Sequence, residues 1–434
     1  ACTEIFERLA YYLGRSLILI FVTASVATGG LGLSDTVAAN MQSNLTAFSY
    51  LLPLFGAVIV DKYIGARYTT PVGMFIAAAG YFTGGIAKSS AGVYAMIFLV
   101  SLGLALFKNG AIIGRVITDK SQMDPAFSMR YTLVNVGAFI GTFLVGILYK
   151  DVFAKDGVLG FAPCFKMAAL MMVLGGLWYI FVCWRFLGDL GKLPFKKTLT
   201  EEEKAAEAKK KEETGTKQPL TTIEKKRIGA IFVASLFSIV FWIFWYLGYM
   251  PVYFYWAENM DWVVAGYQVP STWFDAANSL FCVILGPVTA ALWKKLAARP
   301  QGDMSLFRKT GLGIAIIGVG YLFYAAIDIM RGGEKASVLW LIVFAFLLTM
   351  GEMFFSPLGH SFISKYSPSR YLAVMMSVWG FATFIAAKSY GPVYGLLFGG
   401  KIEFKVACIG VAVVSFAAAL IMIALDKTLS ALVD

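Results

Sequence analysis

Charged residues are scarce in this chain, at 15% of its 434 residues, where roughly 25% is usual for a soluble domain. Hydrophobic residues make up 59%, and the mean hydropathy is +0.73. This composition excludes an ordinary soluble protein and indicates a membrane protein that crosses the bilayer several times. The net charge of +11 requires no nucleic-acid partner, because basic loops on one side of a membrane give the same sum.

Histidine and cysteine are scarcer still. His360 is the only histidine, and the five cysteines are scattered without a CxxC pair. We therefore predict no disulfide and no metal site. The sequence also shows no Ser–His pair and no phosphate-binding loop, which argues against an enzyme. Nothing in it calls for an organic cofactor.

Apolar runs of membrane-spanning length are what the chain has in abundance. They predict about twelve transmembrane helices. These lie at roughly 5–27, 38–60, 68–88, 92–117, 127–149, 162–186, 228–250, 272–296, 306–329, 337–362, 371–395 and 403–425. Lys and Arg concentrate in alternate loops, such as those holding Lys62, Lys294 and Lys365, which predicts that these loops and both termini are cytoplasmic. We expect a multi-pass protein of the plasma or inner membrane.

One charged segment, 189–227, interrupts this pattern. It holds Glu201–Glu203 and Lys209–Lys211 and almost no large apolar residue, so it cannot form a core. We interpret it as a cytoplasmic linker between an N-terminal six-helix bundle, 1–188, and a C-terminal six-helix bundle, 228–434. Two six-helix halves around a midplane cavity are typical of the major-facilitator fold. The fold class expected is therefore an all-α membrane protein of that fold.

The first predicted helix carries an unusual polar stripe. Six polar residues recur on one helical face among apolar neighbours, namely Glu4, Glu7, Arg8, Tyr11, Tyr12 and Arg15. Ionisable groups inside a bilayer cost a few kcal/mol each, so they face a partner helix or a wet cavity. An alternative is that the stripe only anchors the helix end in the headgroup zone. Arg15 lies too deep for that alternative.

Further polar residues interrupt the later spans: Lys108, Asn135, Asp275, Asn278 and Glu352. Arg15 and Lys108 supply positive charge from the first half, and Glu352 supplies negative charge from the second. Such a cavity suits a zwitterion, whose charged ends form charge-assisted hydrogen bonds with opposite walls. Two alternatives stay open: Lys108 and Glu352 could pair for structural reasons, and the asparagines could serve helix packing.

These motifs together resemble the proton-dependent oligopeptide transporter family. The match begins with Glu4-x-x-Glu7-Arg8 and continues in order along nearly the whole chain. The other matching motifs are the loop Asp61–Arg67, Leu106-Phe107-Lys108-Asn109, Asn135-x-Gly137, Trp273-Phe274-x-x-x-Asn278, Gly351-Glu352-Met353 and Met375-Met376-Ser377-x-Trp379.

The resemblance implies roles for individual residues. Arg15 and Lys108 would bind the carboxylate of a peptide, and Asn135, Asn278 and Glu352 its amino end. Tyr11, Tyr12, Tyr50 and Trp379 would line the pockets for side chains and backbone. Proton coupling would fall to Glu4, Glu7, Arg8 and Lys108, because a buried carboxylate can exchange a proton for a salt bridge.

One departure from the family pattern concerns helix 7. Peptide-transporting relatives usually carry a glutamate there, whereas 241–248 reads FWIFWYLG and holds no acid. Asp275 is a possible compensating acid. Trp245 becomes a substrate-binding candidate, since the aromatic residues of this stretch could narrow or reshape the pocket; packing is the alternative.

The function expected is proton-coupled import of di- and tripeptides by alternating access, with protons as the coupling ion and a monomer as the transporting unit. A carrier for another small anion or zwitterion, nitrate-like or a modified amino acid, is the alternative favoured by the missing helix-7 acid. A receptor that kept the cavity and lost transport is a third reading.

Overall fold

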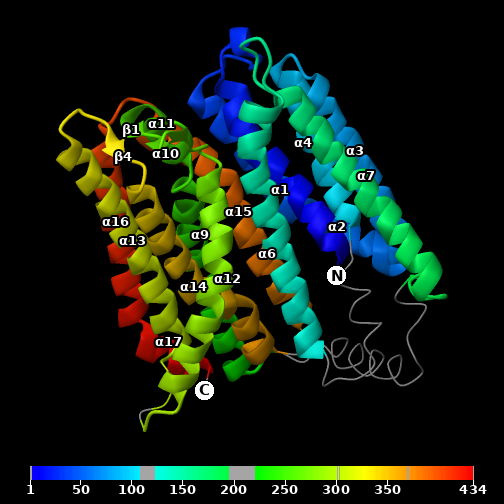
Figure 1. Ribbon diagram of the computed structural model, residues 1–434. Helices are drawn as coiled ribbons and strands as arrows, with labels where there is room; N and C mark the ends of the chain where they lie inside the picture. The colour runs from blue at the N-terminus through cyan, green and yellow to red at the C-terminus, as the bar shows by residue number, and fades with distance from the viewer. Residues whose placement is uncertain are drawn as a thin grey trace. The chain divides into compact units, whose positions relative to one another are not determined.

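The computed structural model describes residues 2–107, 123–194, 220–300, 302, 304–368 and 371–433. Within these ranges twelve long helices overlap the twelve predicted spans one by one (Figure 1). They are α1 (Cys2–Thr23), α2 (Asp35–Lys62), α3 (Ala66–Ile86), α4 (Ser90–Leu106), α6 (Met123–Ile147), α7 (Phe161–Phe186), α9 (Thr222–Leu247), α12 (Trp273–Ala297), α13 (Leu306–Arg331), α14 (Trp340–Tyr366), α15 (Leu372–Phe398) and α16 (Phe404–Ala424).

Short elements cap and connect these helices. They are η1 (Val26–Thr28), the π-helical turn η3 (Leu148–Val152), α10 (Met250–Tyr253), α11 (Tyr255–Asn259), α17 (Asp426–Val433) and four two-residue strands: β1 (Met260–Asp261), β2 (Val263–Val264), β3 (Tyr267–Gln268) and β4 (Ala336–Ser337). Strands β2 and β3 form a hairpin whose two-residue turn, Ala265–Gly266, has positive φ at both positions. β1 pairs in parallel with β4.

Seven of the described helices are long and apolar enough to cross a membrane by length and composition alone. α1 is not among them, because its polar stripe adds too many charges. The exposed face of α7 shows how such a helix meets lipid. Five large apolar side chains line it at helical spacing: Leu170, Leu174, Leu177, Trp178 and Phe181. The chain is thus a helical, multi-pass membrane protein.

The described residues form two compact units. The first contains those of Ala1–Thr198 together with Val263–Leu280, and the second those of Leu199–Trp262 and Phe281–Asp434. The division into bundles 1–188 and 228–434 stays a prediction. The contacts between residues add one feature that the sequence did not predict. The β2–β3 hairpin and the first eight residues of α12 pack with the first unit.

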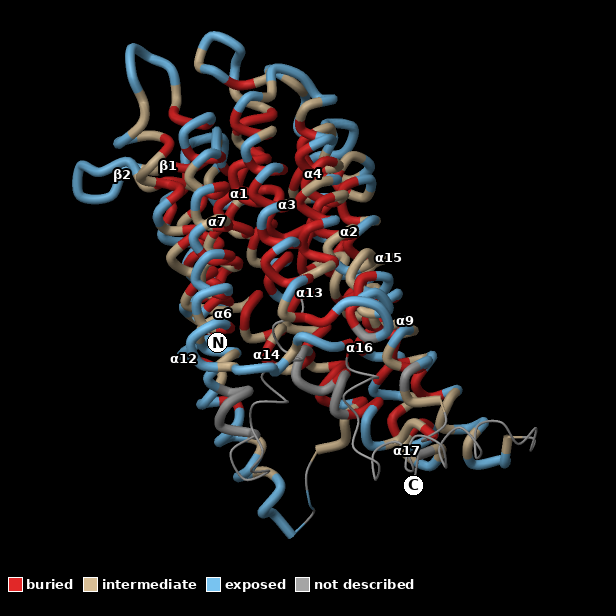
Figure 2. Tube along the Cα trace, turned by 90° about the vertical axis from the view of Figure 1, so that its right-hand side faces the viewer, coloured by how far each residue is buried: buried red, intermediate tan, exposed pale blue. Residues whose placement is uncertain are grey.

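Helix α1 is the centre of the first unit and packs against α6, α7 and α2 (Figure 1). Its buried positions run along most of its length (Figure 2). Two glycines of α6 bring the backbones close. A Cβ at Gly137 would lie 2.8 Å from the Ile5 carbonyl oxygen, and one at Gly141 would lie 2.5 Å from that of Leu9. Small residues at this spacing are a common way to pack membrane helices closely.

The loop between α2 and α3 is fixed by the segment that follows α7. The Arg67 guanidinium donates to the Gly188 carbonyl, and the Arg67 backbone N–H donates to that of Gly191 at 3.0 Å. A Cβ at Gly65 would meet the Gly191 oxygen at 2.1 Å. Gly65 is therefore needed for a close approach of two backbones. A left-handed turn, the usual reason for glycine in a loop, is not the cause, since its φ is −62°.

Two predicted boundaries were wrong. α4 was expected to continue to 117, but it ends at Leu106, where Phe107 turns extended and its N–H bonds back three residues to Leu104. α9 was expected to begin at 228, but it begins at Thr222, inside the predicted linker. The Thr221 hydroxyl and the Glu224 carboxylate form a capping box that starts the helix early.

The close approach of α6 to α1 predicts a strong effect of Gly141→Leu. The new side chain would collide with the Leu9 backbone, and overpacking of this kind costs about 1–3 kcal/mol. We expect the melting temperature of the protein in detergent to fall by several degrees. Gly410→Leu on α16 is the matched control, because nothing lies within 4 Å of its Cβ position. Equal melting temperatures for the two variants would contradict this packing.

Candidate functional site

The polar stripe of α1 contains two ion pairs. Arg8 donates to the Glu7 carboxylate from two nitrogens on one edge of its guanidinium, Nε to Oε2 at 2.5 Å and Nη2 to Oε1 at 2.6 Å. Glu4, one turn earlier, accepts from Nε of Arg130 on α6 at 2.7 Å. Glu4 and Glu7 are both buried. Burial leaves these carboxylates dependent on their arginines, because an ionised carboxylate in a dry helix interface needs a charged partner.

Tyrosines continue the stripe beyond the ion pairs. The Arg8 guanidinium lies 5.1 Å from the ring centre of Tyr11, and the rings of Tyr11 and Tyr12 meet edge to face at 5.4 Å. Tyr11 is buried, whereas Tyr50 on α2 is 43% exposed. Tyr50 therefore has room to contact a ligand, and Tyr11 serves first to hold Arg8.

Arg15 lies in the deepest part of the stripe and is only 5% exposed. Its backbone oxygen accepts from the Gln42 side-chain amide of α2 at 3.1 Å. The next residue, Ser16, donates from its hydroxyl to Oδ2 of Asp275 at 3.0 Å. The structure thus brings the candidate acid Asp275 to α1, one residue from the candidate cation Arg15.

The first turns of α12 are fixed to α6. Trp273 stacks on Phe143 at 4.7 Å, and its indole N–H donates to the Phe143 carbonyl at 3.2 Å. Asn278 lies one turn after Asp275 on α12 and is buried with it. The sequence reading grouped Asn278 with acceptors of the opposite wall. By its contacts this part of α12 belongs with the unit that holds Arg15.

Two other candidates from the first half are less informative. Asn135 is partly exposed on α6, and its side-chain nitrogen donates to the Tyr131 carbonyl of the same helix at 3.0 Å. Its amide oxygen is then the atom suited to accept from a ligand. Lys108 lies outside the described residues.

Glu352 on α14 is the main acidic candidate of the second unit. It is partly buried, and its Oε2 accepts from the Cys282 thiol of α12 at 3.8 Å. A thiol is a weak donor.

The aromatic candidates of the second unit lie in ring clusters. Trp245 on α9 contacts the rings of Trp242, Tyr246 and Tyr249 at 4.8–5.4 Å. It is 8% exposed, and within the described ranges its indole nitrogen has no hydrogen-bond partner. Trp379 on α15 stacks on Phe355 and covers Gly359, where a Cβ would lie 2.1 Å from the indole.

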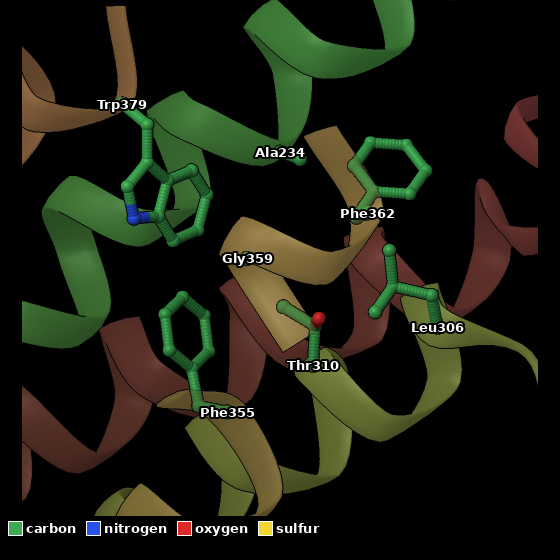
Figure 3. Close-up of a pocket in the computed structure, with 7 residues that line it drawn as sticks. All are labelled: Ala234, Leu306, Thr310, Phe355, Gly359, Phe362 and Trp379. Carbon is green, nitrogen blue, oxygen red and sulfur yellow. The ribbon is translucent and has the colours of Figure 1, made fainter. Parts of the chain in front are cut away.

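A small cavity borders Trp379 (Figure 3). The rings of Trp379, Phe355 and Phe362 surround Gly359, and the Thr310 hydroxyl and the Trp379 indole N–H are the polar side-chain groups of the lining residues. Its volume of about 10 Å³ is close to the least that one water requires. This cavity is therefore too small to hold a peptide side chain.

Sequence reasoning missed Arg130, Ser16 and Gln42 as parts of the site. A signal was available, because Arg130, Gly137 and Gly141 lie at i, i+7 and i+11 and so share one face of α6. That face packs on α1. Ser16 follows Tyr12 by four residues and extends the stripe in the same way.

Comparison with known proteins gives consistent matches. The model of the POT family matches residues 190–398. The chain is 25% identical over 428 residues to an uncharacterized transporter, YclF, of Bacillus subtilis (strain 168), a match that covers 89% of this chain and 84% of that protein. It is 24% identical over 430 residues to a di-/tripeptide transporter of Lactococcus lactis subsp. cremoris, with 87% and 84% covered.

Among solved structures, a crystal structure of a peptide transporter POT in complex with sulfate superposes with a TM-score of 0.87 at 23% identity. The superposition covers 100% of this chain and 94% of the other. Likeness at this identity establishes the fold, which is that of the major-facilitator transporters. The family-model match over residues 190–398 and the ordered motifs from Glu4 to Trp379 agree with this likeness, so the chain resembles the POT family along nearly its whole length.

Proposed function

We propose that the protein imports small peptides, di- and tripeptides, together with protons by alternating access. The observation that carries the proposal is that two buried carboxylates of α1 are each paired with a partly exposed arginine, Glu7 with Arg8 of the same helix and Glu4 with Arg130 of α6. Charged side chains in a membrane helix cost free energy, so they are rare there unless they serve a function. The named relatives that transport di- and tripeptides support the substrate class.

The salt bridges suggest how protons are coupled. A buried carboxylate is stable either ionised beside its arginine or protonated without it. Protonation of Glu7 would release Arg8, and protonation of Glu4 would release Arg130. Each proton that binds can therefore replace one ion pair. Glu4–Arg130 joins α1 to α6, and Glu7–Arg8 lies within α1. A proton crossing 100 mV supplies about 2.3 kcal/mol, which is enough to drive accumulation.

The two ends of a peptide suit opposite charges in the chain. The carboxylate would bind Arg15 and Lys108, and the ammonium would bind Glu352, with the amide oxygens of Asn135 and Asn278 as further acceptors. Tyr12, Tyr50, Trp245 and Trp379 would contact side chains and backbone. Binding uses charge-assisted hydrogen bonds, which are worth about 1.5–3 kcal/mol each.

We further propose a plasma or inner membrane location with both termini in the cytoplasm. The positive-inside pattern supports it, because Lys62 and Arg67 between α2 and α3 and Lys294 and Lys295 at the end of α12 fall on the same predicted side. The candidate residues all belong to one chain, so we expect a monomer to transport. Protons are the coupling ion, and no organic cofactor takes part.

The direct test is uptake of labelled dialanine by liposomes that contain the purified protein. We expect accumulation when the lumen is more alkaline than the medium, and only equilibration after an ionophore collapses the gradient. Unlabelled di- and tripeptides should compete, and single amino acids should not. A chain that binds dialanine without moving it would be a receptor and would refute the proposal.

The missing helix-7 acid favours the alternative substrate class, a small anion or another zwitterion. A thermal-shift assay that compares nitrate, a modified amino acid and dialanine as ligands distinguishes the two substrate classes. Stabilisation by dialanine and not by nitrate is the result we expect. Stabilisation by nitrate or carboxylates alone would favour the anion carrier.

The proposed orientation of the peptide predicts opposite effects of two substitutions. Glu352→Gln should weaken dialanine binding about tenfold or more, since one charge-assisted contact is lost, but should leave N-acetyl-dialanine unaffected. Arg15→Ala should weaken dialanine similarly and spare the peptide amide. Affinities from isothermal calorimetry would show this. If each substitution weakened the binding of end-blocked and free dialanine equally, Glu352 and Arg15 would not bind the two ends of the peptide.

A further inference from the structure

A second cavity, of about 430 Å³, lies in the first unit where α1 and α3 end and α7 begins (Figure 1). None of its described lining residues belongs to the proposed substrate site. Its volume is within the range of about 300–1,000 Å³ that is usual for small-ligand pockets. The lining consists of glycines, two alanines, Lys88 and six larger apolar side chains: Phe21, Val26, Leu31, Ile86, Val158 and Leu159. We call it the Lys88 cavity.

Backbone hydrogen bonds fix the walls of the Lys88 cavity. The Gly29 N–H donates to the Val26 carbonyl at 3.1 Å and closes the turn η1. The loop before α7 is joined to that turn, because the Leu159 N–H donates to the Thr28 carbonyl at 2.9 Å. Gly29 has a φ of 88°, which glycine adopts without strain. The cavity is therefore part of the fold and needs no ligand to form.

Positive charge lies at this cavity. Among the described residues that line it, Lys88 alone is charged, and its side chain is exposed. No ion pair between described side chains involves Lys88. A second lysine, Lys166 on α7, lies against the same wall, since a Cβ at Gly85 would be 3.0 Å from its Cγ. The adjacent Lys155 and Asp156, before Val158, offset each other.

The end of α3 explains only part of this placement. Lys88 follows the last residue of α3 by two positions, where the helix dipole favours a cation. That effect requires neither a cavity nor a second lysine. α7 begins at the same cavity, and the dipole at its N-terminus favours negative charge instead. Because the two helix ends oppose each other, the lysines decide the sign of the preferred ligand, which is negative.

An exposed apolar stripe on α3 leads away from the cavity. Phe75, Phe82 and Ile86 are 36%, 52% and 58% exposed and lie at i, i+7 and i+11, so they share one face of the helix. Ile86 is both the end of this stripe and part of the cavity lining. The proposed topology places this end of α3 in the outer leaflet, at the depth of the lipid headgroups. A ligand with a charged head and an apolar chain matches both surfaces.

We propose that the Lys88 cavity binds an anionic phospholipid of the outer leaflet, with its phosphate at Lys88 and an acyl chain along the stripe Phe75–Phe82–Ile86. The contact of an ammonium with a phosphate is a charge-assisted hydrogen bond. The apolar walls and the stripe favour a lipid over a free anion, because they are buried when an acyl chain covers them. This inference goes beyond the proposed function and does not depend on the transported substrate.

The experiment is native mass spectrometry of the purified protein in detergent, titrated with phosphatidylglycerol or with phosphatidylcholine. We expect one phosphatidylglycerol to bind more tightly than phosphatidylcholine. Lys88→Gln should weaken phosphatidylglycerol about fivefold, the usual effect of one lysine on an anionic lipid, and Lys88→Arg should retain binding. Lys401→Gln is the matched control, because it removes an exposed lysine on the same predicted side of the second unit.

Two further arms test the cavity itself. Ala162→Phe fills it from an exposed lining position and leaves the charge unchanged, so it should weaken phosphatidylglycerol. Inorganic phosphate, added as a competitor, should not displace the lipid. Melting temperatures show whether each variant is folded. If Ala162→Phe is unstable, the two substitutions of Lys88 decide.

Equal affinities for the two lipids would overturn the inference. Equal weakening by Lys88→Gln and Lys401→Gln would also overturn it, since it would indicate a general effect of charge, as would equal weakening by Lys88→Gln and Lys88→Arg. Displacement by inorganic phosphate would indicate a site for small anions, and unchanged binding in a folded Ala162→Phe would place the lipid elsewhere; both results refute the proposal. The assay contains no peptide, so failure of the proposed function would leave its result intact.

Discussion

The cost of placing charge inside a membrane helix governs the structure around α1. Glu4 and Glu7 are buried at the start of that helix, and each is held by an arginine. Arg15 lies deeper on the same helix, and the next residue, Ser16, donates to Asp275 of α12. An isolated helix with these charged side chains would insert poorly into a bilayer. The surrounding helices must therefore enclose it, and the first unit is built to do so.

The enclosure depends on small residues as much as on ion pairs. Gly137 and Gly141 let α6 approach the backbone of α1, and this approach places Arg130 within reach of Glu4. On the opposite side, Gly14 leaves space for Tyr81, since a Cβ there would lie 2.3 Å from the ring. Close packing and charge pairing thus support each other, because a dry interface strengthens each ion pair that it surrounds.

Much of this could be predicted from the sequence, because the dominant signals are local. Hydrophobic runs located the twelve helices, and the spacing of polar residues from Glu4 to Arg15 identified the inward face of the first. The order of the motifs predicted the family that the chain resembles. Periodicity assigns a residue to a face of its own helix but does not name the neighbour across that face. For this reason the partners of Glu4 and Asp275 emerged only from the structure.

Other features could not be predicted because the sequence patterns that mark them are short. The capping box Thr221–Glu224 was hidden at the edge of a charged linker, and Val264-Ala265-Gly266-Tyr267 was too brief to be read as a hairpin. Gly65 is needed for a close contact with Gly191, which no local pattern reveals. The stretch 241–248 of α9 holds no acid, as the sequence shows directly, whereas the position of Asp275 beside α1 depends on the fold.

The central claim is that the buried carboxylates of α1 carry protons when substrate crosses. Its most direct measurement records the pH inside liposomes, with a trapped fluorescent dye, when dialanine is added outside and no gradient is imposed. The account predicts that the lumen acidifies in step with dialanine entry and that liposomes without protein do not respond. Entry of dialanine with no change of internal pH would contradict it.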